Sequence, residues 1–208
     1  MRSINNNIPQ YLSSNIHQAS ERGDIESIRS LLLNSNINVN QKNYHGFTPL
    51  HLAVQKGHIE VVKLLLTIPD INVNQTNCFG KTPLHIAVEK RNLEIVGSLL
   101  SVPSILVNEK DRYGSTPLHI AVSEKRGIEI VNSLLKFPSI DINVKDNFSN
   151  TPLQVSVRID YIGAVMALLS MPGILVNESD KHGKTILQYA RENGHKKCLE
   201  LLQKSLKK

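Results

Sequence analysis

The sequence contains no tryptophan, only four phenylalanines and five tyrosines, and only two cysteines. Cys78 and Cys198 lie far apart and lack the close spacing of a zinc knuckle or a disulfide-rich domain. We therefore expect free thiols in a reducing compartment. The chain has no Gly-rich phosphate loop, no paired-carboxylate motif and no Ser-His-Asp or Cys-His arrangement. We expect no enzymatic activity, no catalytic residue, no metal site and no cofactor.

Long hydrophobic runs are also missing. No stretch reaches the roughly 18 to 20 apolar residues that a transmembrane helix needs. Residues 1–13 form a polar tail without the apolar run of a secretory signal. We expect a soluble, cytoplasmic protein. The Asn- and Lys-rich, Trp-free composition is typical of an AT-rich genome, such as that of an intracellular microbe whose protein acts in the host cytosol.

The net charge of +6 is confined to one end of the chain. Residues 1–180 hold sixteen basic and sixteen acidic residues, whereas residues 181–208 hold eight basic and two acidic ones. Two interpretations follow for the lysines of this end. They either contact phosphates of nucleic acid or of an anionic membrane, or they only keep a terminal cap solvated. The second needs no partner, and no aromatic stacking platform accompanies these lysines: Lys196, Lys197, Lys204, Lys207 and Lys208.

The sequence repeats itself. The motif Thr-Pro-Leu-His-Leu-Ala-Val begins at Thr48, and related motifs begin at Thr82, Thr116, Thr151 and Thr185, in steps of 34, 34, 35 and 34 residues. One step before Thr48 lies Ser14, which begins a divergent copy. A fixed period of this length is the signature of a stack of similar units. We predict one domain, residues 14–208, with the units 14–47, 48–81, 82–115, 116–150, 151–184 and 185–208.

Each unit predicts a pair of helices. Thr48 is a good N-cap, and Pro49 suits the first helical position because its missing N–H costs nothing there. Gly57 is expected to end this helix in a left-handed conformation. A second apolar helix follows and ends before Pro69, and the polar stretch 70–81 predicts a projecting turn. Since one helix pair cannot bury its apolar face alone, the units must stack.

The repeated motifs resemble the ankyrin-repeat family. GFTPLHLAVQKGHIEVVKLLL (46–66), GKTPLHIAVEKRNLEIVGSLL (80–100) and GSTPLHIAVSEKRGIEIVNSLL (114–135) are similar to its Gly-x-Thr-Pro-Leu-His signature and second-helix pattern. The resemblance implies an all-α repeat solenoid of antiparallel helix pairs with β-turn fingers, whose concave face binds another protein. It implies an adaptor, a scaffold or a masking inhibitor. We expect a monomer that binds a protein partner.

Two units depart from the family pattern. The unit that starts at Thr116 has one further residue near Lys125 to Gly127, between its helices. Ser149 stands where the other turns have glycine, and Ser156 replaces the core alanine of the fifth unit. We therefore predict that the unit 151–184 is the weakest internal link.

Two polar registers follow the repeat. Histidine recurs at one position of the first helix, and glutamine continues it: His17, His51, His85, His119, Gln154 and Gln188. Successive helices pack about 8 to 10 Å apart, whereas zinc ligands lie about 2 Å from a shared ion, so these histidines do not predict a metal site. The resemblance implies a structural hydrogen bond near the finger base instead.

Asparagine recurs at the start of the extended stretch: Asn40, Asn74, Asn108, Asn143 and Asn177. Asparagine side chains bond nearby backbone, so a structural role is one interpretation. The other comes from the resemblance, because this position is a substrate of asparaginyl hydroxylases in the family. Asn40, Asn74 and Asn108 are the candidate hydroxylation sites.

Candidate partner-binding residues fall in three registers. Aromatic or imidazole rings precede the finger glycine: His45, Phe79, Tyr113, Phe148 and His182. They either contact a partner, as aromatic hot spots do, or pack over their own turns. The neighbouring finger position varies: Tyr44, Cys78, Arg112, Asn147 and Lys181. The end of the first helix varies too: Gln55, Lys56, Glu89, Lys90, Ser123 and Arg158. In the family the matching positions commonly determine partner specificity, although drift on a solvated face gives the same variation.

Overall fold

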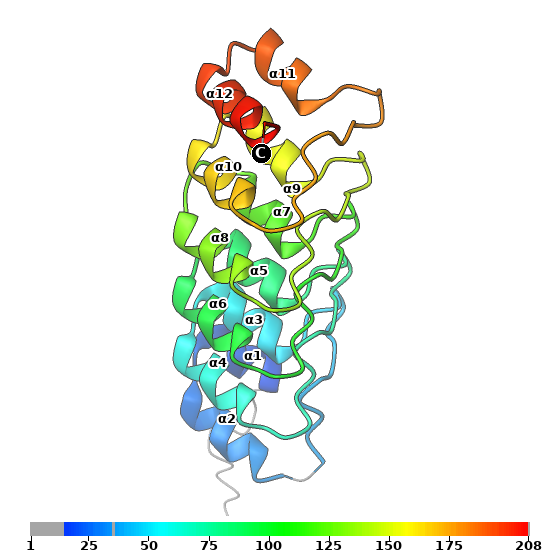
Figure 1. Ribbon diagram of the computed structural model, residues 1–208. Helices are drawn as coiled ribbons and strands as arrows, with labels where there is room; N and C mark the ends of the chain where they lie inside the picture. Colours follow the sequence, from blue (N-terminus) through cyan, green and yellow to red (C-terminus); the bar gives the residue numbers. More distant parts are fainter. Residues whose placement is uncertain (1–14, 35, 208) are drawn as a thin grey trace, which may run out of the picture.

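The chain forms a stack of helix pairs. The computed structural model describes residues 15–34 and 36–207, and the tail predicted for residues 1–13 lies outside them. The described residues form α1 (Ile16–Arg22), α2 (Ile25–Leu32), α3 (Pro49–Lys56), α4 (Ile59–Leu66), α5 (Pro83–Glu89), α6 (Leu93–Leu100), α7 (Pro117–Val122), α8 (Ile128–Leu135), α9 (Pro152–Arg158), α10 (Ile162–Leu169), α11 (Ile186–Glu192) and α12 (Lys196–Ser205). The prediction of an all-α repeat solenoid is confirmed (Figure 1).

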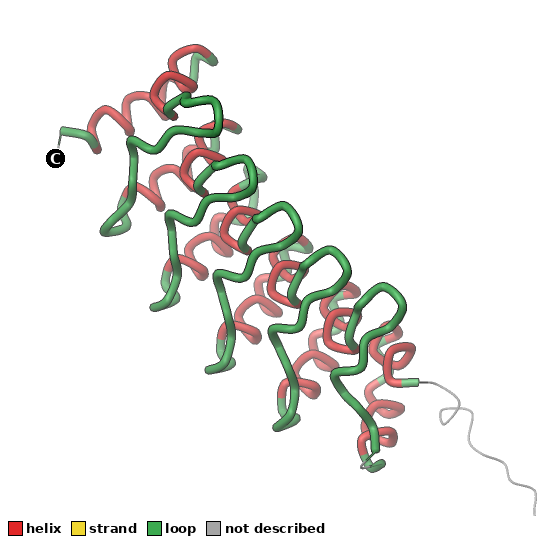
Figure 2. Tube along the Cα trace, turned by 90° about the vertical axis from the view of Figure 1, so that its right-hand side faces the viewer, coloured by secondary structure: helices red, strands yellow, loops and turns green. Residues whose placement is uncertain are grey.

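The helices form two layers. The odd-numbered helices pack in succession, α1 on α3 and so on to α11, and the even-numbered helices do the same from α2 to α12. Each pair is joined by a short turn, whereas the longer connection that follows each of α2, α4, α6, α8 and α10 projects to one side of the stack (Figures 1 and 2). One edge of the molecule is therefore built from loops that repeat in register.

The sequence sets the helix boundaries as predicted. Thr48 caps α3, because its side-chain oxygen accepts the N–H of His51 at 3.3 Å, and Pro49 is the first helical residue. Gly57 ends the helix at φ 79°. The same threonine cap begins α5, α7, α9 and α11. The divergent first unit uses Asn15, whose side chain accepts the N–H of Gln18. A cap of this kind stabilises a helix by about 1 kcal/mol.

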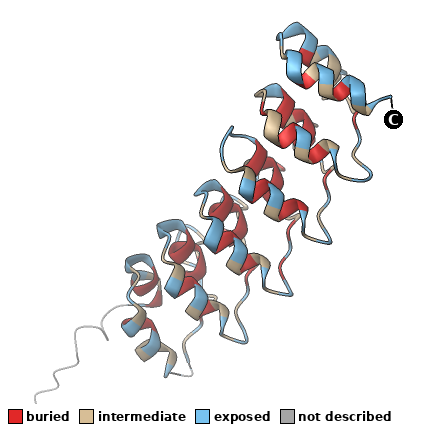
Figure 3. Cartoon of the chain, turned by 60° about the vertical axis from the view of Figure 1, so that its left-hand side comes forward, coloured by how far each residue is buried: buried red, intermediate tan, exposed pale blue. Residues whose placement is uncertain are grey.

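One continuous apolar core runs through the stack (Figure 3). Its repeated members are leucines of the first helices, among them Leu50, Leu84 and Leu118, which are completely buried. The last unit closes the core with Leu202 and Cys198, both completely buried. Neighbouring units thus bury each other's apolar faces, as a repeat of this size requires. None of the described helices is long and apolar enough to cross a bilayer.

Candidate interaction surface

Each long connection ends in a tight turn that we call a finger, and the described chain has fingers at residues 43–47, 77–81, 111–115, 146–150 and 180–184. In the second of these, Asn77 Oδ1 accepts the N–H groups of Phe79 at 2.9 Å and Lys81 at 3.0 Å. The same two bonds form at the equivalent positions Asn43, Asp111, Asp146 and Asp180. We did not predict this register from the sequence, although an Asn or Asp occupies the first position of every finger.

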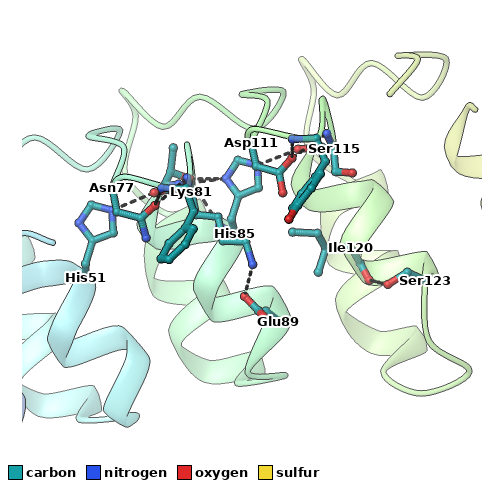
Figure 4. A network of polar contacts seen from close by, with 12 residues as sticks. His51, Asn77, Lys81, His85, Glu89, Asp111, Ser115, Ile120 and Ser123 are labelled. Carbon is teal, nitrogen blue, oxygen red and sulfur yellow. Dashed lines mark hydrogen bonds and ion pairs between the residues drawn. The ribbon is translucent and has the colours of Figure 1, made fainter. Parts of the chain in front are cut away.

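The repeated histidines join each first helix to the next finger (Figure 4). His51 Nδ1 accepts the N–H of Thr48 at 3.1 Å, so its Nε2–H donates to the Lys81 carbonyl at 3.0 Å. His85 and His119 repeat this arrangement with the carbonyls of Ser115 and Asn150. The structural hydrogen bond expected for these histidines is confirmed.

The first and fifth units differ from this arrangement, because His17 Nε2 bonds the Gln41 carbonyl at 2.8 Å and glutamine replaces histidine in the fifth unit. Gln154 Oε1 accepts the N–H of Thr151 at 2.7 Å, and its Nε2 donates to the Glu178 carbonyl at 3.0 Å. The acceptor lies six residues before Lys184, the equivalent of Lys81. The amide thus bonds the next connection but not the base of its finger.

The environment of the histidines keeps them neutral. Burial lowers the pKa of His51 to about 4, although the hydrogen bond to the Lys81 carbonyl opposes the change. Burial also lowers the pKa of His85 and of His119. Both ring nitrogens of His51 are occupied by backbone groups. In the described part of the chain no group of three or more His, Cys, Asp or Glu side chains could hold a metal ion.

The asparagine register also bonds the next unit. Asn74 Nδ2 donates to the Ser104 carbonyl at 2.7 Å, and its Oδ1 accepts the N–H of Leu106 at 2.9 Å. Asn40, Asn108 and Asn143 make the same pair of bonds. The structural interpretation is therefore confirmed for these four, and hydroxylation of Asn40, Asn74 and Asn108 stays a prediction.

All sixteen candidate partner-binding residues are exposed: Tyr44, His45, Gln55, Lys56, Cys78, Phe79, Glu89, Lys90, Arg112, Tyr113, Ser123, Asn147, Phe148, Arg158, Lys181 and His182. They lie on the fingers and at the ends of the odd-numbered helices. Two side-chain contacts link a finger to the end of the helix that follows it. Lys81 Nζ pairs with Glu89 at 2.7 Å, and the Arg158 guanidinium donates to Asn150 Oδ1 at 3.0 Å. We call these sixteen residues the finger–helix surface.

Aromatic rings and cations alternate along the finger edge. Phe79, Tyr113 and Phe148 are 42%, 54% and 49% exposed. The Arg112 guanidinium lies 4.9 Å from the centre of the Phe79 ring and 5.9 Å from that of Tyr113. The rings are therefore flanked by a cation of the same or the next finger and keep about half of their surface open, a geometry in which cation–π attraction orders an exposed arginine.

Backbone bonds tie successive fingers together into what we call the finger ladder. The N–H of Cys78 donates to the His45 carbonyl at 3.2 Å, and equivalent bonds join Arg112 to Phe79 and Asn147 to Tyr113, at 3.0 and 2.9 Å. Such close approach depends on glycine. A Cβ added at Gly46 would lie only 2.8 Å from the backbone nitrogen of Cys78. The exposed finger residues are thereby held in a fixed register.

The finger ladder ends before the last finger. Ser149 adopts φ 62° at the position of these glycines, and its Cβ occupies the space that the next finger uses elsewhere. Among the backbone bonds of the described residues, none joins the Lys181 N–H to the Phe148 carbonyl. The sequence showed the loss of the glycine but not this consequence.

Helix pairs repeated every 34 or 35 residues, with fingers projecting to one side, define a repeat-solenoid protein. A family model described as "Ankyrin repeats (3 copies)" matches residues 6–77, 68–146 and 124–208. The chain belongs to the ankyrin-repeat family. No curated protein matches the sequence.

Three solved structures are similar over most of the chain. The ankyrin repeat protein EF0377 is 25% identical with a TM-score of 0.82, covering 90% of this chain and 96% of its own. An ankyrin repeat domain from Acinetobacter baumannii AYE is 25% identical with a TM-score of 0.84, covering 91% and 96%. The ankyrin repeat domain of Bcl-3, a member of the IkappaB family, is 27% identical with a TM-score of 0.83, covering 92% and 86%.

Proposed function

We propose that this chain is a protein-interaction module, acting as an adaptor, a scaffold or a masking inhibitor, that binds a folded protein through the finger–helix surface. Ankyrin repeats generally mediate protein–protein interaction. The observation that supports this surface is the exposed finger edge, where Arg112 lies against Phe79 and Tyr113. Aromatic and arginine side chains are the commonest hot spots of protein interfaces.

The mechanism is rigid display. Each finger is fixed by its Asn or Asp side chain, the fingers 77–81, 111–115 and 146–150 also by the histidine of the preceding helix, and every finger except the last by the finger ladder. A surface that is already ordered loses little conformational entropy on binding, so more of the contact energy appears as affinity.

The test uses four exposed side chains of the finger edge. Partners are captured from cell lysate, identified by mass spectrometry and titrated by calorimetry. We expect Y44A/F79A/R112A/Y113A to weaken binding at least about 30-fold, because losing one or two hot spots costs about 2 kcal/mol or more. The matched control is L93A/M166A, which truncates two exposed apolar residues of α6 and α10 on the other helix layer. Unchanged affinity of the fourfold variant would exclude this surface.

The basic end supports a second candidate, association with nucleic acid or an anionic membrane. Lys196 and Lys197 occupy the first turn of α12, where the helix dipole disfavours cations, whereas Lys204 lies in its last turn. The helix dipole therefore accounts for Lys204 but not for Lys196, and Lys197 Nζ pairs with Glu200 at 3.0 Å. Binding through these lysines should weaken steeply with salt, which a titration against duplex DNA or anionic vesicles measures. The cytoplasmic location and monomeric state stay predictions.

A further inference from the structure

A hollow lies on the finger–helix surface, between the finger 146–150 and the last finger. It has a volume of about 420 Å³ and is lined by Phe148, Asn150, Arg158, Asp180, Lys181 and His182. We call it the notch. Binding pockets for small ligands typically measure about 300 to 1,000 Å³, so the notch has room for a side chain of a partner.

Ser149 accounts for the notch. At the three preceding fingers, a Cβ on Gly46, Gly80 or Gly114 would lie within 2.7 to 2.8 Å of a backbone nitrogen of the next finger. Ser149 has that Cβ, so the last finger cannot approach in the same way. The substitution that interrupts the finger ladder thus leaves space on the interaction surface.

The cations of the notch are oriented by contacts with neutral groups. The Arg158 guanidinium donates to Asn150 Oδ1 at 3.0 Å and lies 5.4 Å from the centre of the Tyr189 ring. Lys181 Nζ lies 5.1 Å from the centre of the Phe148 ring. Neither cation takes part in an ion pair among the described residues. At the positions equivalent to Asn150 and Arg158, by contrast, Lys81 and Glu89 form an ion pair.

The one carboxylate that lines the notch, that of Asp180, accepts hydrogen bonds from its own finger. Asp180 Oδ1 accepts the N–H groups of Lys184 at 3.0 Å and His182 at 2.9 Å, and these bonds hold the pKa of Asp180 below its usual value. A negatively charged Asp180 lowers the net charge of the notch, which disfavours a polyphosphate more than a single carboxylate.

We propose that the notch receives a glutamate or aspartate side chain of a protein partner, with Arg158 and Lys181 at its carboxylate and Phe148 against its methylene groups. This inference rests on the proposed function and adds the chemistry of the partner. The excess of six positive charges in residues 181–208 supports it, since that end of the molecule attracts an acidic surface and speeds encounter.

The experiment is an NMR titration of the full chain. The probe is the terminally blocked peptide acetyl-Gly-Gly-Glu-Gly-Gly-amide, and its Gln analogue is the control. We expect the Glu peptide to shift the backbone amide signals of Phe148, Arg158 and Lys181 in a salt-sensitive way, and the Gln peptide to leave them in place. Equal shifts with both peptides would overturn the proposal.

Three variants test whether the notch residues bind the peptide. R158Q/K181Q should abolish the shifts, whereas K56Q/K90Q, which removes two charges from the same surface outside the notch, should retain them. S149G, which permits the close approach seen at the other fingers, should weaken the peptide shifts without lowering the melting temperature. Shifts that persist in R158Q/K181Q would refute the assignment, and so would stronger shifts at these residues with inorganic phosphate or duplex DNA.

The outcome can be separated from that of the proposed function. If the Glu peptide causes no NMR shifts at the notch while Y44A/F79A/R112A/Y113A still fails to bind the captured partner, the proposed binding of an acidic side chain in the notch is wrong and the proposed interaction surface is retained. If the peptide binds but the fourfold variant retains its partner, the finger edge is excluded as the contact surface.

Discussion

The Asn or Asp residue of the facing finger accounts for a difference in what determines the pKa of each buried histidine. Asp111 raises the pKa of His85 and Asp146 raises that of His119, each against the larger effect of burial. The finger that faces His51 has Asn77 in place of an aspartate, and no carboxylate is among the main influences on the pKa of His51. Asn77 Nδ2 is also buried without a hydrogen-bond partner among the described residues.

We predict that N77D raises the pKa of His51 above its value of about 4, because a nearby carboxylate favours the imidazolium. The turn should persist, since Asp111 and Asp146 make the same two backbone bonds. An NMR titration of the His51 Cε1 signal measures the change. The reciprocal variant D111N should lower the pKa of His85. A His51 titration that is identical in N77D and the unmodified chain would contradict this account.

At the scale of helices and fingers, the sequence predicted the helix boundaries but missed the contacts between successive fingers, for a physical reason. Threonine caps, proline at the first position and Gly57 are local signals, so the helix boundaries followed from them. The finger ladder depends on how closely two segments 34 residues apart approach each other. A glycine shows only that a left-handed turn is favoured, and the contact that makes it necessary appears in the structure alone.

The fifth unit provides the prediction at this scale. Amide hydrogen exchange should be faster in α9 and α10 than in α5 to α8, because Ser149 holds a left-handed conformation that costs about 1 kcal/mol and no ladder bond secures the next finger. Ser156 adds less, since its hydroxyl donates to the Leu153 carbonyl at 2.8 Å.

The variant S149G should slow this exchange. Its control is S139G, at an exposed residue without a positive φ, which should give no gain in protection. Equal protection from amide exchange in α9, α10 and the helices α5 to α8 of the unmodified chain would contradict the prediction.

For the whole molecule, the repeat predicted the architecture but not which exposed residues bind. A core position is fixed by its neighbours, so Leu50, Leu84 and Leu118 could be assigned from the period. An exposed side chain such as that of Tyr44 is not held by neighbours within the chain, so its identity has no internal cause to deduce. The notch needed the structure because it arises from two fingers and not from either one.

Acid sensitivity is a property of the whole stack. The folded-state pKa of His51 lies below its ordinary value of 6.5, and those of His85 and His119 are lowered as well. The unfolded chain therefore takes up protons first as the pH falls, and the free energy of unfolding decreases from about pH 6.5 toward pH 4. Each histidine contributes at most about 1.4 kcal/mol per pH unit in that window.

We expect H51Q/H85Q/H119Q to flatten this dependence, because Gln154 makes comparable backbone bonds without titrating. Urea unfolding at pH 7 and pH 5 provides the comparison. The variant should lose less stability than the unmodified chain on acidification. An equally steep loss in the triple variant would contradict the assignment to the buried histidines.

The junctions between units have a consequence for how such a chain can grow. His51, His85 and His119 donate to main-chain carbonyls, and Asn40, Asn74, Asn108 and Asn143 bond only main-chain groups of the following unit. The polar part of the joint therefore does not depend on the side chains of the receiving unit, whereas the apolar part requires its core residues. A unit that keeps its histidine, its asparagine, its finger glycine and its buried apolar residues can follow another such unit, so duplication of residues 82–115 yields a longer protein in one genetic step. Ser149 marks the one described joint where this interchangeability is lost.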